Sequence, residues 1–315
     1  MKLMKRSPKM ILFAAAALLL AGLCVAQNYG RRYRYGGGHW TQTEGGVPVD
    51  ENTVRTAREI ASHSTGTPEW TNAPGFEKDV FTFVRIIRDR VPDAPRGSGQ
   101  WITDFPDSDL NFSFRLQQVT TIRTDPDGRT LRLTDPDLFN YPWIYMVEPG
   151  SLLLRDEEVP ILRKYLLNGG VLWADDFWGG MEWKQFADQI RRVLPEDQWV
   201  ELPMDHPIFH CVFDIKVPKN KLQTPAEPLA IRRHSTDYTY EDFHETEDGR
   251  LDECRDMHVR AILDDKGRIM VLATHNCDNG DSWEREGESE WFFHEFSEKR
   301  GYPLGINVIF YLMTH

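Results

Sequence analysis

Two adjacent carboxylates are the side chains of this chain that are most clearly placed to do chemistry. Asp175 and Asp176 follow the apolar segment 171–174, which predicts a buried strand, and precede a stretch with helical spacing. Open α/β sheets bind ligands beyond the carboxyl ends of their strands, so we expect Asp176 to border the main cleft, with Phe177 and Trp178 as an apolar wall. Aspartate is also favoured before a helix, and capping and loop hydrogen bonding are the alternative interpretation.

An imidazole and a separate carboxylate are further candidates. His206 lies between Asp205 and Pro207, where it could serve a general acid–base step or bind a metal. A structural histidine is the alternative. Asp104 ends the segment Trp-Ile-Thr-Asp, which has an extended character, and its alternative is a turn residue.

The polar run 275–281 resembles a calcium loop but fails on register. With Gly280 as the sixth position, Cys277 falls third and His275 first, where a helix-loop-helix calcium site needs oxygen ligands. Asn276 and Asp278 therefore remain candidates for ligand binding, with a solvated turn as the default and a looser carboxylate site as the alternative. Zinc-type Cys/His spacing is absent as well, so the sequence assigns no metal and no cofactor. The acidic stretches 241–247 and 284–290 are expected to be exposed faces.

The amino terminus has the order of a secretory signal peptide over residues 1–26. Residues 1–9 are basic, residues 10–23 are apolar, and small residues precede a cleavage point near Ala26. The apolar run is shorter than the ~20 residues that span a bilayer, and an uncleaved anchor is the alternative. We expect a periplasmic or secreted mature chain without a transmembrane span.

Composition limits the class of partner. The chain is 40% hydrophobic and 12% aromatic, which excludes wholesale disorder, and its formal net charge of −12 argues against general nucleic-acid binding. Residues 27–75 are expected to be a flexible leader with a short helix over 52–62. The expected partner is an unknown polar ligand or an envelope protein.

Three cysteines would remain after cleavage, in a compartment that permits disulfides. Cys254 and Cys277 flank a predicted hairpin and would be the favoured pair. The alternative, with Cys211 included, is three unpaired and partly buried thiols.

Strand and helix patterns alternate over residues 76–315, which we expect to form one α/β domain. Apolar β-branched runs predict strands over 80–87, 142–147, 171–174 and 199–202, and helical spacing predicts helices over 110–119, 156–167, 181–194 and 305–313. Crossover connections of this kind imply a mainly parallel, doubly wound sheet. Segments 259–263 and 268–273 predict a C-terminal hairpin, and residues 218–257 a long polar insertion or lid.

Several short motifs occur in order along the chain, namely Trp101-Ile102-Thr103-Asp104, Pro106, Asp109, Thr120, Asp135-Pro136, Tyr141-Pro142, Leu167-Asn168-Gly169-Gly170, Asp175-Asp176, Asp205-His206-Pro207-Ile208, Gly267-Arg268, Asn276, Asp278 and Gly305-Ile306-Asn307. Their order and spacing over residues 76–315 resemble an uncharacterised bacterial family known as domain of unknown function 4159. The resemblance implies a flavodoxin-like, class I glutamine-amidotransferase-like sheet, and it implies no reaction, cofactor or catalytic residue. The GxCxG or GxSxG turn of a nucleophilic enzyme is absent from the sequence.

Two functional classes follow, and the sequence leaves open whether the protein is an enzyme. The first is a non-catalytic ligand- or partner-binding domain of the bacterial cell envelope. The second is a hydrolase of envelope material working through Asp176 and His206. Catalysis would gain support if four side chains met in one cleft, namely Asp104, Asp176, His206 and Asp278.

Overall fold

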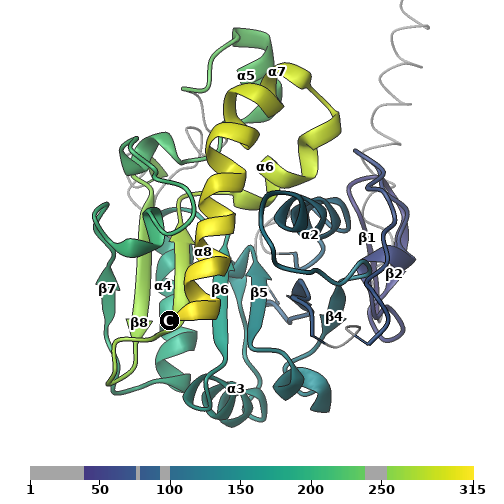
Figure 1. Cartoon of the computed structure of the whole chain (residues 1–315). Helices are drawn as coiled ribbons and strands as arrows, with labels where there is room; N and C mark the ends of the chain where they lie inside the picture. Colours follow the sequence, from purple (N-terminus) through teal and green to yellow (C-terminus); the bar gives the residue numbers. More distant parts are fainter. Residues whose placement is uncertain (1–38, 76–78, 93–99, 238–253) are drawn as a thin grey trace, which may run out of the picture.

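A seven-stranded mixed sheet forms the centre of the molecule (Figure 1). The computed structural model describes residues 39–75, 79–92, 100–237 and 254–315. The predicted signal peptide lies outside the described residues, as does the middle of the predicted insertion. The sheet has the order β4-β3-β5-β6-β9-β8-β7. Its strands are β3 (Val84–Ile86), β4 (Arg129–Leu131), β5 (Trp143–Val147), β6 (Val171–Asp175), β7 (Trp199–Glu201), β8 (His258–Leu263) and β9 (Ile269–His275).

The first five strands in that order run parallel. β5 and β6 are direct neighbours, with Trp143 opposite Val171 and Val147 opposite Asp175. β9 continues the parallel set beside β6, and β8 and β7 complete the sheet in antiparallel fashion. The predicted α/β class, the mainly parallel sheet and the C-terminal hairpin are therefore confirmed.

Helices cover both faces of the sheet because side chains alternate along its central strands. Tyr145 and Trp173 belong to a core shared with α2 and α8, whereas Ile144 and Met146 belong to a second core shared with α3 and α4. This arrangement is the doubly wound architecture expected from the sequence. The helices are α2 (Asp107–Val119), α3 (Glu158–Leu167), α4 (Gly179–Val193), α5 (Glu227–Arg233), α6 (Asn279–Glu284), α7 (Glu290–Phe292) and α8 (Tyr302–Thr314), with a π-helical stretch (Phe293–Gly301) joining the last two.

The first predicted strand is much shorter than its apolar run. The pattern over 80–87 predicts a continuous strand, but the ladder holds only Val84–Ile86. Phe81 instead forms an isolated bridge with Thr124, which lies before β4. Most of the run is apolar and buried, and burial alone does not extend strand pairing.

The leader is more structured than the sequence suggested. Two short strands, β1 (Trp40–Gln42) and β2 (Pro48–Asp50), form an antiparallel pair. The helix expected over 52–62 is wrong, because only the single 3₁₀ turn Ala57–Glu59 forms. The N–H groups of Ala57 and Arg58 both donate to the carbonyl of Asp127. Helical spacing here reflects burial of Val54 and Ala57 against the segment that precedes α2.

Where the structure describes the predicted insertion, it forms a 3₁₀ turn (Lys219–Lys221) and α5. Residues 238–253 lie outside the described residues. No helix of the described ranges is long and apolar enough to cross a membrane.

Candidate functional site

The residue after each of three parallel strands has a left-handed backbone. Glu148 follows β5, Asp176 follows β6 and Asn276 follows β9, with φ of 46°, 58° and 58°. Such values are uncommon for residues other than glycine, and aspartate and asparagine tolerate them best. The chain therefore turns away directly after each of these three strands, and polar side chains lie at the carboxyl edge of the sheet.

Asp175 is a structural carboxylate at this edge. It accepts hydrogen bonds from the hydroxyls of Tyr145 and Thr274 and from both the backbone and side-chain N–H groups of Asn279. Burial raises the pKa of Asp175, and these donors oppose that rise. Its bonds tie together β5, β6, β9 and the start of α6, so Asp175 holds the carboxyl ends of the central strands in place.

The loops after β6 and β9 are bonded to each other. The N–H of Asp176 donates to the carbonyl of Cys277 at 3.0 Å, and the N–H of Asn276 donates to the carbonyl of Phe177 at 2.9 Å. The side-chain oxygen of Asn276 accepts from the N–H of Gly179 at 2.8 Å. Asn276 therefore fixes the two loops side by side, which brings their carboxylates together.

Three aspartates from separate parts of the chain meet there, and we call them the aspartate cluster. Asp104, Asp176 and Asp278 can each present an oxygen within 4.8 Å of the others. Their exposed fractions are 1%, 7% and 7%. Asp278 also caps α6 by accepting from the N–H of Asp281 at 2.8 Å.

Asp104 has the most unusual environment of the three. Both of its carboxylate oxygens are buried, and neither has a hydrogen-bond partner within the described ranges. The carboxylate lies directly against Gly280, where a Cβ atom would come within 1.9 Å of Oδ2. An ionised carboxylate that is buried without donors is unfavourable, so a positive group bound beside Asp104 would be strongly stabilised.

Arg85 of β3 anchors the segment that carries Asp104. The Nε of this fully buried guanidinium donates to both oxygens of Asp109 at 3.0 Å, and its Nη1 donates to the carbonyls of Trp101 and Thr103 at 3.1 and 2.8 Å. Charge-assisted bonds of this kind are strong and directional. Arg85 therefore determines where the chain between β3 and α2 passes the carboxyl edge.

Two more acids extend the aspartate cluster along α6. Asp281 and Glu284 can each present an oxygen within 4.8 Å of Asp104, and they are 3% and 0% exposed. Arg285 donates through Nε to Asp281 at 2.9 Å, and its guanidinium lies 3.6 Å from Glu284. The protein itself thus supplies part of the positive charge for this half of the acidic region.

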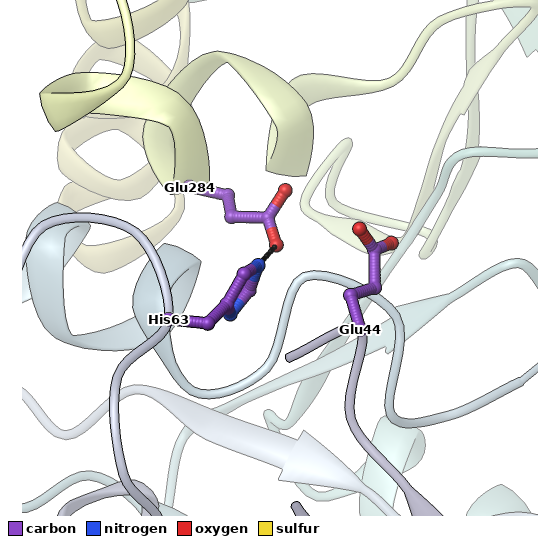
Figure 2. A group of neighbouring side chains, drawn as sticks. All are labelled: Glu44, His63 and Glu284. Carbon is purple, nitrogen blue, oxygen red and sulfur yellow. Dashed lines mark ion pairs between the residues drawn. The ribbon is translucent and has the colours of Figure 1, made fainter. Parts of the chain in front are cut away.

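His63 supplies a second positive charge from the leader (Figure 2). Its Nδ1 lies 2.9 Å from Asp107 and its Nε2 lies 2.9 Å from Glu284, whereas no ion pair joins it to nearby Glu44. Hydrogen bonds to Asp107 and Glu284 raise the pKa of His63 to about 10. A histidine with a carboxylate at each nitrogen is a cation without a free lone pair, so the group Glu44, His63 and Glu284 is poorly suited to hold a metal.

Burial and mutual repulsion raise the pKa of Asp104, Asp278 and Glu284. For Asp104 the causes are burial, then the charges of Glu284 and Asp281, and they raise its pKa well above the ordinary value. For Asp278 the causes are burial, then Asp176 and Asp281, and they raise its pKa well above the ordinary value too. Burial raises the pKa of Glu284 to about 7. Grouped carboxylates with shifted pKa values are typical of functional sites.

The two predicted wall residues have different surroundings. The indole N–H of Trp178 donates to Asp176 at 3.0 Å, so Trp178 adjoins the aspartate cluster. Phe177 is fully buried and packs on Phe186 and Trp183 of α4. The bond from Trp178 fits the loop-bonding part of the alternative interpretation of Asp176, and the residue before α4, Trp178, makes no side-chain capping hydrogen bond.

His206 does not join the aspartate cluster. Its ring packs on Tyr311 in the last turns of α8 at 5.2 Å, and its Nδ1 accepts from the N–H of Ile208 at 3.2 Å. Burial lowers the pKa of His206. These contacts fit the structural interpretation of His206. Of the four side chains expected to meet in one cleft, His206 was the only imidazole, and it lies elsewhere.

The run 275–281 is not a solvated turn. His275 and Asn276 are 4% and 0% exposed, and Glu284, expected on an exposed face, is also 0% exposed. The reason is Trp283, which is buried against Phe112 of α2 at 4.5 Å between ring centroids and draws α6 into the molecule. The other acidic stretch, 241–247, lies outside the described residues.

Sequence reasoning missed Asp281, Glu284 and His63 as site residues. The spacing of Asp278, Asp281 and Glu284 by three residues was an available signal, because such positions share one side of a helix. His63 gave no local signal, since it reaches the site only through the folding of the leader. A separate open pocket of about 210 Å³ beyond β3 and β4 is lined by Glu51, Arg132 and others, and by none of the candidate residues.

The three cysteines among the described residues are free thiols. The favoured Cys254–Cys277 disulfide is therefore absent, and the alternative of unpaired thiols holds. Cys277 is wholly buried beside the loop of Asp176, and burial raises the pKa of its thiol.

Comparison with known proteins places the chain in a family. The family model described as "Domain of unknown function (DUF4159)" matches residues 83–313. Those residues include the whole aspartate cluster together with Arg85, Asp281 and Glu284, whereas Glu44 and His63 lie before them. No curated protein matches the chain.

Proposed function

Because the chain belongs to the family of domain of unknown function DUF4159, whose description assigns no activity, we propose a function from the site itself. The protein is a non-catalytic α/β domain of the cell envelope that binds a positively charged group of a ligand at the aspartate cluster. The proposal rests on the environment of the Asp104 carboxylate. It has two buried oxygens without donors, next to further acids.

Charge at the cluster favours a cationic ligand over an anionic or neutral one. Four further carboxylates gather around Asp104, and two of them, Asp281 and Glu284, form ion pairs with Arg285 or His63. Arg88 lies near Asp176 and donates to the carbonyls of Val147 and Glu148. Negative charge is therefore concentrated around Asp104.

The groups around the cluster do not favour nucleophilic or acid–base chemistry. A buried thiol of raised pKa such as Cys277 is a poor nucleophile. Burial lowers the pKa of His275 to about 3, and its Nε2 faces the carbonyl of Gly179 at 3.0 Å. His206 contacts α8 instead of Asp176. Binding accordingly has more support than the alternative of a hydrolase working through Asp176 and His206.

Thermal unfolding of the purified mature protein with spermidine, magnesium or calcium tests the binding proposal. Ligand at about 100 times its Kd stabilises a native state by ~2.7 kcal/mol, which raises the Tm of a domain of this size by about 5–10 °C. We expect this rise for at least one cation, its loss in Asp104→Asn, and its retention in Asp188→Asn. Asp188 is a matched control because it pairs with Lys184 on exposed α4. Equal shifts in both variants, or no shift with any cation, would refute the proposal.

The envelope location rests on the basic, apolar and small-residue regions of residues 1–26. Intact mass of the protein from fractionated cells tests it. We expect a periplasmic or secreted chain that begins near Gln27. A mature protein whose mass includes Met1, or one retained in the cytoplasm, would contradict export.

A further inference from the structure

The cation that fits the aspartate cluster is defined by the geometry of three carboxylates. We infer that Asp104, Asp176 and Asp278 form a binding site for one hard divalent metal ion, such as Mg²⁺, Ca²⁺ or Mn²⁺. This inference rests on the proposed function and names its ligand class.

Distances within the cluster suit a shared metal ion. An oxygen of each aspartate lies within 4.8 Å of the others. Oxygen ligands sit ~2.0–2.6 Å from Mg²⁺ or Ca²⁺, so two ligands on opposite sides of one ion are about 4–5 Å apart. A single ion can therefore contact all three side chains without a large movement of the backbone.

The hydrogen bonding of Asp104 and Asp278 also supports a bound cation. Asp278 accepts from the N–H of Asp281 with one oxygen. Asp104 accepts no hydrogen bond with either oxygen. The contrast with Asp175, which is equally buried but fully hydrogen-bonded, shows that this fold supplies donors to a carboxylate that serves only structure.

The positions of the three aspartates are fixed before any ligand binds. Asp104 is held by the segment anchored on Arg85 and fits only because Gly280 has no side chain. Asp176 is fixed by its bond to the loop of β9, and Asp278 by its role as cap of α6. Preorganised ligands on rigid elements are what a specific metal site requires.

The chemistry of the ligands selects the class of metal. All three ligand groups are carboxylates, which suit Mg²⁺, Ca²⁺ and Mn²⁺, whereas thiolate and imidazole ligands suit softer ions. The buried thiol of Cys277 bonds to the carbonyl of Leu222 and to the hydroxyl of Thr224. His63 has a carboxylate at each nitrogen. Neither offers a softer ligand to the trio.

Isothermal titration of the chelator-treated mature protein with MgCl₂, CaCl₂, MnCl₂ and, separately, spermidine tests the inference. We expect one metal ion per chain. Asp104→Asn and Asp278→Asn should each weaken its binding by at least about tenfold, since loss of supporting groups around a metal already costs 10–100-fold. Asp188→Asn, which removes the same charge from α4, should bind as the wild type does. Asparagine tolerates the φ of 63° at position 104 and also caps helices, so both variants should fold, which circular dichroism verifies.

The outcomes separate this inference from the proposed function. If spermidine binds in an Asp104-dependent manner and no metal does, the metal inference is wrong and the cation-binding function stands. If metals bind equally well to Asp104→Asn, the trio is not the site and the inference is wrong. If no cation binds at all, both proposals fall.

Discussion

Replacing Gly280 with alanine tests the packing that holds Asp104 in place. An added Cβ would lie 1.9 Å from Oδ2 and 2.9 Å from Cγ of Asp104, far inside contact distance, and 3.4 Å from Asp278, which is tolerable. Asp104 is 1% exposed, so its side chain cannot turn out into solvent to avoid the contact. Overpacking of this kind lowers the free energy of unfolding by ~1–3 kcal/mol. Alanine in a helix raises it by up to ~1 kcal/mol relative to glycine.

We therefore expect Gly280→Ala to lower the free energy of unfolding by about 1–2 kcal/mol, and the Tm by roughly 2–8 °C. Urea denaturation at constant m-value is the measurement. The same change in an Asp104→Gly background should be neutral or stabilising, because the clashing carboxylate is gone and glycine accepts φ of 63°. The double-mutant cycle of Gly280→Ala and Asp104→Gly should give a coupling energy of about 2 kcal/mol between positions 280 and 104. Equal losses in both backgrounds would show that the clash is not with Asp104 and that our account of its position is incorrect.

Three further predictions concern charges and thiols. His63→Gln should destabilise the protein by about 2 kcal/mol below pH 6.5, and this difference should vanish as the pH rises toward about 10. The reason is that folding raises the pKa of His63 from 6.5, so the histidine stabilises the fold only while it is protonated. A difference that grows with pH in thermal melts would contradict the ion pairs. Arg85→Met should cost about 3–5 kcal/mol in urea unfolding, because it leaves Asp109 buried and unpaired, and a loss below about 1 kcal/mol would argue against that pair. Iodoacetamide without reductant should label Cys254 and Cys277 in unfolded but not in native protein by mass spectrometry, whereas a disulfide would leave both unlabelled after unfolding.

Local pattern was sufficient to predict the architecture. The runs that became β5 and β6 are short, apolar and separated by a helix with a clear stop at Asn168, and these features alone imply neighbouring parallel strands. The hairpin of β8 and β9 could also be predicted from local pattern, because Gly267 adopts the positive φ of 83° that its turn needs. Asp176 could be placed at a strand end for the same reason, since strand ends are properties of sequence neighbours.

The composition of the site was decided by tertiary structure. Asp104, Asp176 and Asp278 were each named from the sequence, but so was His206, and only the folded chain separates them. Which polar residues meet depends on the order of strands in the sheet, where β9 lies next to β6 although β7 and β8 intervene in sequence.

Burial was the other property that the sequence did not reveal. Glu284 looked like part of an exposed acidic face, yet the insertion of Trp283 into the core makes it fully buried. His63 reaches the same place from a leader that has no helical or strand pattern there. Sequence spacing thus determined which elements form and where each one ends, whereas the convergence of acids around Asp104 arises from packing between distant segments, which no local pattern encodes.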